Sequence, residues 1–149
     1  MSGLPARKLA ASIALAAVIL GAAGFSWLWF AAGKEEARLA LGRSLYGTHC
    51  ASCHGAKLEG QPDWQEPRPD GRMPAPPHDA SGHTWHHSDQ ALFLITKKGL
   101  GAVVPDYESD MPAFEGVLAD TEIQAILDFI KSNWPERERE YQEARSRAE

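Results

Sequence analysis

The stretch Cys50-Ala51-Ser52-Cys53-His54 decides the fold of this chain. Two thiols separated by two residues and followed at once by an imidazole form the attachment motif of a c-type haem. The spacing of a single helical turn brings both sulfurs to one edge of a porphyrin, where each adds to one vinyl group. His54 then lies below the iron as an axial ligand. Since the chain contains two Cys residues in all, the motif predicts one covalent haem c held by Cys50, Cys53 and His54.

Two other kinds of site use the same residue types. A Cys-x-x-Cys pair also forms redox-active disulfides, but that motif belongs in a βαβ pattern, and this sequence does not alternate strand-like and helix-like segments. A structural zinc site needs a second pair of Cys or His ligands at a defined spacing. Haem attachment is therefore the favoured interpretation.

An apolar segment without any charged residue runs from Leu9 to Phe30, directly after Arg7 and Lys8. As a helix, its roughly 22 residues extend about 33 Å, enough to cross a hydrocarbon core of about 30 Å. Aromatic residues crowd its far end, as is typical of the headgroup region. The basic pair marks the other end as cytoplasmic.

We predict that residues 1–33 form an uncleaved transmembrane anchor. The alternative is a cleaved signal peptide, because Ala22-Ala23-Gly24 offers the small residues that a signal peptidase prefers. The anchor is favoured because the apolar run continues past that point into Trp27, Trp29 and Phe30. In both cases the remainder is exported, which agrees with haem attachment outside the bacterial cytoplasmic membrane. The predicted location is therefore the inner membrane, single-pass, with the haem domain in the periplasm.

The net charge of the chain is −5, which is not basic enough to suggest nucleic acid as a partner. Residues 1–33 hold two basic and no acidic residues, so the exported part carries 13 basic and 20 acidic residues, a net of −7. Redox partners with a basic docking patch would be steered to it, and salt would weaken the encounter.

Helical spacing of apolar residues appears in three segments of the exported part. Residues 34–48 form the first, and its Gly42 would cost up to about 1 kcal/mol relative to Ala, which predicts the close approach of another helix, although a merely tolerated glycine is the alternative. Residues 88–98 form the second, with Ser88 or Asp89 as N-cap. Residues 121–134 form the third, with Thr121 as N-cap.

Two remaining segments lack apolar periodicity. Residues 55–83 are a long polar connection rich in Gly and Pro, which would be suspect in an all-protein core but natural around a haem edge. Residues 135–149 are almost wholly charged and predict a solvated, frayed helical tail without chemistry.

Over roughly residues 36–134, these motifs in this order resemble the class I c-type cytochromes. The resemblance rests on the attachment motif, on Met111-Pro112, on Thr84-Trp85, and on a Gly and an aromatic residue in the first helix with partners in the last. It implies an all-α, class I cytochrome c fold of about three to four core helices around one covalent haem, here preceded by the transmembrane helix. The predicted division is thus 1–33 anchor, 34–134 cytochrome c domain and 135–149 charged tail.

The resemblance also assigns cofactor-binding roles. Pro76 is similar to the proline whose carbonyl accepts the Nδ1 hydrogen of the proximal histidine, with Pro77 as a near substitute because the stretch between Gly55 and Pro76 is longer than in the family. Trp85 resembles the tryptophan that reaches a haem propionate. Met111 resembles the distal methionine, on the iron opposite His54.

The sixth ligand determines the chemistry. A thioether is a weak donor that raises the reduction potential relative to a second imidazole. Met111 is preferred over Met73, which lies close before Pro76 in the segment expected on the His54 side; a histidine is the other alternative. Four clustered histidines, His78, His83, His86 and His87, are a weaker prediction of a copper or zinc site.

The predicted function is electron transfer, without enzymatic activity, between membrane-associated redox partners on the periplasmic side. Two alternatives remain open. The chain is the haem subunit of a larger membrane oxidoreductase, or, if Met111 is labile, a haem-based sensor or reductase of a small ligand.

Overall fold

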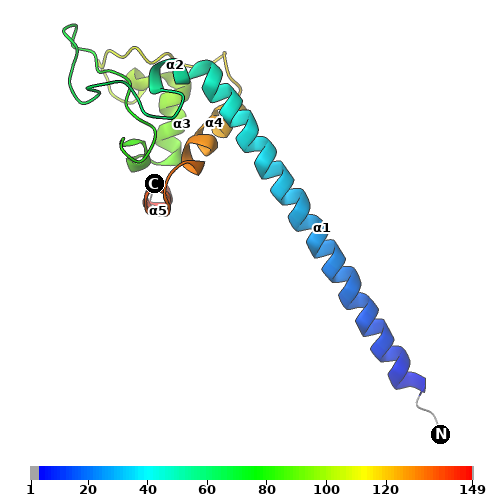
Figure 1. The fold of residues 1–149 in the computed structure, drawn as a ribbon. Coiled ribbons are helices and arrows are strands. Elements are labelled where there is room, and N and C mark those ends of the chain that lie inside the picture. The colour runs from blue at the N-terminus through cyan, green and yellow to red at the C-terminus, as the bar shows by residue number, and fades with distance from the viewer. Residues whose placement is uncertain (1–3, 149) are drawn as a thin grey trace. The chain divides into compact units, whose positions relative to one another are not determined.

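The computed structural model describes the backbone of residues 4–148 and the side chains of residues 10, 13 and 19–148. The chain divides into two compact units, Met1–Ala37 and Arg38–Glu149. Helix α1 (Leu4–His49), labelled in Figure 1, contributes residues to both units.

The first unit contributes the N-terminal part of α1. No helix among the described residues combines the length and the hydropathy that a membrane span requires. The side chains of residues 9, 11, 12 and 14–18, which belong to the predicted anchor, lie outside the described residues.

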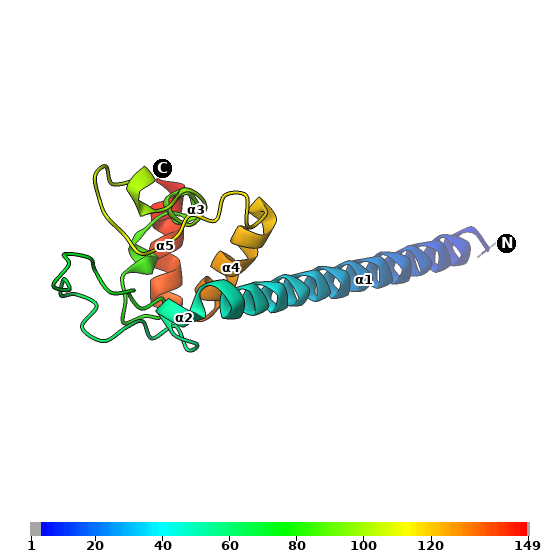
Figure 2. The same cartoon turned by 90° about the horizontal axis from the view of Figure 1, so that it is seen from above.

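The second unit holds the remaining elements, in the order α2 (Ala51–His54), η1 (Thr84–His86), α3 (Asp89–Lys98), η2 (Leu100–Ala102), α4 (Asp120–Ser132) and α5 (Glu136–Arg147). Every regular element in residues 4–148 is a helix, which confirms the all-α class. The connection between α2 and η1, drawn in green in Figure 2, contains no helix or strand, as its Gly and Pro content predicts.

The C-terminal turns of α1 pack directly on α4 at Gly42. A Cβ atom at this position would lie 2.5 Å from the carbonyl carbon of Ala125 and closer still to its oxygen, so only a glycine fits the observed approach. Tyr46, one turn later, is 2 % exposed, and its ring centroid lies 5.5 Å from that of Phe129. The predicted packing reason for Gly42 is therefore confirmed.

The core of this unit centres on α4, whose apolar stripe is buried as the 3.6-residue period predicts. Ile123, Ile126 and Ile130 are at most 3 % exposed, and Trp134 follows at 1 %. Helix α4 begins at Asp120, one residue before the predicted cap Thr121. Its first turn is closed by Glu122, whose Oε2 accepts a 2.8 Å hydrogen bond from the backbone N–H of Ala119.

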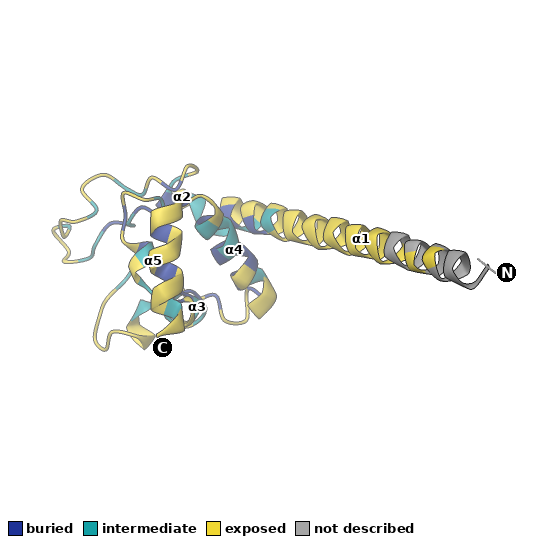
Figure 3. Ribbon diagram, turned by 90° about the horizontal axis from the view of Figure 1, so that it is seen from below, coloured by how far each residue is buried: buried dark blue, intermediate teal, exposed yellow. Residues whose placement is uncertain are grey.

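The charged C-terminal segment forms the ordered helix α5, and one face of it is buried. Gln142 is 0 % exposed and Glu138 is 8 % exposed. Figure 3 shows dark blue, buried segments of α5 between yellow, exposed ones. The Gln142 side-chain amide donates to Asp89 Oδ1 at 2.8 Å and to the His87 carbonyl at 3.3 Å. The predicted solvated tail is thus, on this face, a helix that packs on η1 and on the start of α3.

Candidate haem site

The attachment motif forms one helical turn, which includes α2 and directly follows α1. His54 N–H donates to the Cys50 carbonyl at 2.9 Å, and Gly55 N–H donates to the Ala51 carbonyl at 3.0 Å. Gly55 then ends the turn with φ +81°, a conformation that glycine adopts without strain. Cys50 is half-buried and Cys53 is exposed, and burial together with the neighbouring Cys53 raises the pKa of the Cys50 thiol to about 11. Both sulfurs and the imidazole therefore come from a single turn, as haem attachment requires.

The His54 ring is oriented by the backbone of the long connection. Its Nδ1 lies 2.8 Å from the carbonyl oxygen of Pro76, so that Nδ1–H donates and Nε2 keeps its lone pair. Burial lowers the pKa of His54, and the hydrogen bond to Pro76 opposes that shift in part. A neutral imidazole with its second nitrogen anchored in this way is the usual state of a metal-ligating histidine. Of the two candidate prolines, the structure places Pro76 against His54.

The same connection supplies a second imidazole, that of His78, whose place beside His54 the sequence does not predict. The rings of His54 and His78 stack with centroids 3.9 Å apart and planes inclined by 21°. His78 Nδ1 lies 2.8 Å from Thr84 Oγ1, and the His78 carbonyl accepts a 2.7 Å hydrogen bond from Trp134 Nε1. Burial holds the pKa of His78 well below its ordinary value. His78 is therefore a neutral wall of the site, and a single histidine in a Pro-rich loop gave no signal of that role.

The histidine cluster does not gather as a metal centre. Within the described part of the chain, no group of three His, Cys, Asp or Glu side chains is arranged to hold a metal ion. His83 instead stacks on Trp64 with ring centroids 5.4 Å apart, and the ring of His86 meets that of Trp85 edge to face with centroids 3.8 Å apart.

Trp85 tests whether the structure fits a haem. Its indole Nε1–H is buried and has no hydrogen-bond partner among the described residues. A buried polar group left unpaired costs about 1–3 kcal/mol, so native proteins nearly always satisfy it. An acceptor from outside the chain, such as a haem propionate, would satisfy this N–H. The orphaned donor thus fits the predicted role of Trp85.

Met111 lies in the connection between η2 and α4. The side chain is half-buried, and its backbone N–H donates to Ser109 Oγ at 3.1 Å. Three residues later Phe114, 7 % exposed, meets the ring of His49 at 5.9 Å, edge to face. Because His49 directly precedes Cys50, this contact brings the Met-Pro segment beside the attachment motif.

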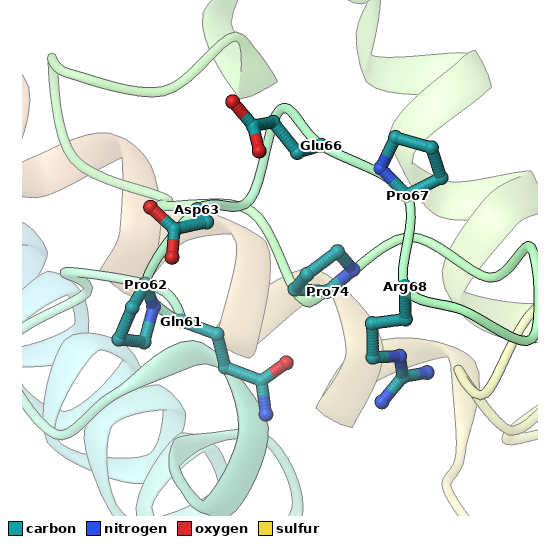
Figure 4. Close-up of a pocket in the computed structure, with 7 residues that line it drawn as sticks. All are labelled: Gln61, Pro62, Asp63, Glu66, Pro67, Arg68 and Pro74. Atoms are coloured by element: carbon teal, nitrogen blue, oxygen red, sulfur yellow. The ribbon is translucent and has the colours of Figure 1, made fainter.

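A separate open pocket of about 450 Å³ lies on the long connection (Figure 4). Gln61, Arg68 and Pro74 are among the residues that line it, and none of the predicted site residues does. The pocket is therefore lined by the long connection and not by the residues predicted to bind the haem.

Comparison with known proteins agrees with this geometry. The model of the family described as Cytochrome c matches residues 39–134, about two thirds of the chain. The chain therefore belongs to the cytochrome c family, and its cofactor is a covalently bound haem c. Comparisons with curated proteins and with solved structures returned no match.

Membership of this family implies electron transfer by the bound haem. The matched region ends at Trp134, so α5 lies beyond it. The structure brings Cys50, Cys53, His54 and Pro76 together, while Trp85 and Met111 come from the two segments that flank α3. Pro76, Trp85 and Met111 lie far from the attachment motif in the sequence, so the spacing of that motif alone does not predict them.

Proposed function

We propose that this protein carries single electrons through one haem c, with His54 and Met111 as axial ligands, between membrane-associated partners on the periplasmic side of a bacterial inner membrane. The observation that carries the proposal is the 2.8 Å contact between His54 Nδ1 and the Pro76 carbonyl. It leaves Nε2 as the free, basic nitrogen for the iron. Bound haem supplies the one-electron chemistry, and the protein supplies attachment, ligands and exclusion of water.

The proximal side is rigid, which favours electron transfer with little rearrangement. His54 is held by Pro76 on one edge and by the stacked ring of His78 on its face. Tyr46, whose hydroxyl donates to the Gly55 carbonyl at 2.9 Å, ties the end of α1 to the end of the attachment turn. Rotation of the His54 ring would break these contacts together.

Met111 is the proposed distal ligand because its segment approaches the attachment motif through Phe114 and His49. Met73 belongs to the connection that already packs on the His54 side through Pro76. A soft thioether raises the reduction potential of the haem, which suits a carrier that accepts electrons readily.

The anchor and the location rest on the sequence of α1. The charge-free run Leu9–Phe30 lies within this one helix. Trp27, Trp29 and Phe30 each expose 65–72 % of their area, an arrangement that an aromatic belt at a membrane surface would stabilise. Anchoring would raise the effective concentration of the haem domain near membrane-bound donors and acceptors.

The proposed partners are redox proteins with a basic docking patch. The net charge of −7 after residue 33 would steer them by long-range attraction. The rate of electron transfer to such a partner should therefore fall as ionic strength rises.

The test is the optical spectrum of the membrane fraction in both oxidation states. Oxidised wild-type protein should show the weak near-infrared band of an Fe(III)–methionine bond, and Met111→Ala should lose it while Met73→Ala retains it. If the wild-type band is missing and the reduced haem binds CO at once, the distal position is open. Ligand sensing or reduction would then replace electron transfer as the function.

A further inference from the structure

The long connection between α2 and η1 contains a closed loop, residues 61–75. The backbone N–H of Gln61 donates to the Ala75 carbonyl at 2.9 Å, and the Ala75 N–H donates to Gln61 Oε1 at 2.8 Å. These two bonds join the ends of the loop immediately before Pro76, whose carbonyl orients His54. The base of the loop is thus part of the proximal side of the haem site.

The tip of this loop is a tight turn that presents two arginines. Arg68 N–H donates to the Arg72 carbonyl at 2.9 Å, and Gly71 N–H donates back to the Arg68 carbonyl at 2.8 Å. Gly71 makes this turn with φ +84°. The Arg72 N–H is held by Asp70 Oδ1 at 3.1 Å, which further fixes the turn.

Both arginines bind one carboxylate, that of Asp110. Arg72 Nη1 lies 2.6 Å from Asp110 Oδ1, and Arg68 Nη2 binds the other oxygen, Oδ2. Asp110 is the residue directly before Met111. The tip of the loop therefore binds the side chain of the residue next to the proposed distal ligand, although the two arginines are 42 and 38 residues away in the sequence.

The charges around this contact favour it. The two guanidinium groups carry the charge opposite to that of the carboxylate that they bind. Asp70 lies 3.8 Å from Arg68, and Glu108 lies 3.6 Å from Arg72. A single exposed ion pair contributes little, but one carboxylate whose two oxygens are both occupied forms a network with defined geometry.

We propose that Arg68 and Arg72 are positioning residues for Met111. By holding Asp110 they restrain the segment that carries the thioether and slow its departure from the iron. One loop would then support both axial ligands, His54 through Pro76 at its base and Met111 through the two arginines at its tip. This inference rests on the proposed His54/Met111 ligation.

The test uses the holo-cytochrome with the double variant Arg68→Gln/Arg72→Gln. Both changes lie far from Met111 in sequence, so an effect on its ligation that Asp110→Asn reproduces passes through Asp110. The measurements are the intensity of the near-infrared methionine band and the limiting rate at which cyanide replaces the distal ligand in the oxidised protein. We expect the limiting rate of cyanide binding to rise at least about threefold in the double variant, because it loses two ion pairs that restrain the state in which Met111 is bound to the iron.

A matched control removes an exposed ion pair of the same kind elsewhere. Lys97 Nζ lies 2.7 Å from Asp120 Oδ1, and Lys97→Gln should leave the cyanide rate unchanged. Arg72→Lys, which keeps the charge without the fork of donors, should give an intermediate rate. The triple variant Asp110→Asn/Arg68→Gln/Arg72→Gln should have nearly the same cyanide rate as Asp110→Asn or the double arginine variant, because each of these changes removes the same ion-pair network.

Salt provides a second readout. High ionic strength should accelerate cyanide binding to the wild type towards the rate of the double variant, while the double variant responds little. If the double variant yields too little holoprotein, the single variants Arg68→Gln and Arg72→Gln serve for the same comparison.

The outcomes separate this inference from the proposed function. A wild-type protein without the methionine band overturns both. A wild-type protein with the band and a double variant with an unchanged cyanide rate overturns the role of the arginines and leaves the ligation intact. A faster cyanide rate in the double variant, together with an unchanged rate in Lys97→Gln, supports the positioning role of the two arginines.

Discussion

Replacement of Gly42 by alanine tests the helix crossing that supports the attachment turn. A Cβ atom at residue 42 would lie 2.5 Å from the carbonyl carbon of Ala125 and 3.0 Å from Phe129 Cβ. Ordinary contacts of this kind are about 3.5–4.0 Å. The obstructing atoms at Ala125 belong to the backbone of α4, which cannot rotate away as a side chain would, so the two helices have to separate.

Two opposing terms set the magnitude. Alanine is favoured over glycine within a helix by up to about 1 kcal/mol, whereas an extra carbon in a packed core costs about 1–3 kcal/mol and occasionally more. Because the clash is with backbone, we expect the upper part of that range, and hence a net loss of about 2 kcal/mol in the free energy of unfolding. The melting temperature of a domain of this size should then fall by about 6–10 °C.

The assay is chemical and thermal denaturation of the holoprotein, followed by tryptophan fluorescence and by the Soret band. Gly47→Ala is the matched control, because Gly47 lies in the same helix and a Cβ there would meet no atom within 4 Å. That variant should be unchanged or more stable by up to about 1 kcal/mol. Equal stability of the two variants would refute the inferred close approach.

Three further predictions follow from α5, α3 and η1. Gln142→Ala removes buried hydrogen bonds and should lower the free energy of unfolding by about 2 kcal/mol, whereas the exposed Glu140→Ala should change it little, both measured by denaturation. Burial alone would raise the pKa of Asp89, but hydrogen bonds from Lys131 and Gln142 hold it below the ordinary 3.8. The stabilisation of the folded protein by the ionised carboxylate is therefore present above pH 3.8 and is lost as the pH falls further. Acid titration should show a smaller loss of stability in Asp89→Asn than in the wild type, and identical curves would contradict the assignment. Trp85→Phe should lower the reduction potential, because the negative charge of an unpaired propionate favours the oxidised haem; potentiometry that shows no shift would remove Trp85 from the site.

The parts of the fold that local spacing determines could be predicted from the sequence. The attachment motif needs only one turn of helix, and the apolar stripe of α4 has the period of a buried helix face. The close helix approach at Gly42 could be predicted for a similar reason, because a glycine inside a helix has a free-energy cost that packing has to offset.

The parts that depend on polar side chains could not be predicted in the same way. Glu138 and Gln142 have the spacing of a helix face, but the identity of a polar residue is the same whether it is buried or solvated. The sequence therefore predicts a solvated, frayed helical tail over residues 135–149. The pairing of Asp110 with Arg68 and Arg72 joins segments about forty residues apart, and many other charges offered equal partners. His78 is one of four clustered histidines, and only the fold determines which of them stacks on His54.

The position of α5 has a consequence for how the domain is delimited. The family match ends at Trp134, and a chain cut there would keep every residue proposed to bind the haem. However, that shorter chain would lose Tyr141, which packs on Trp85 with ring centroids 5.3 Å apart, and Gln142, which donates a hydrogen bond to the His87 carbonyl. A piece of the chain that keeps Trp85 covered and the His87 carbonyl paired therefore extends through α5, beyond the boundary of the family match.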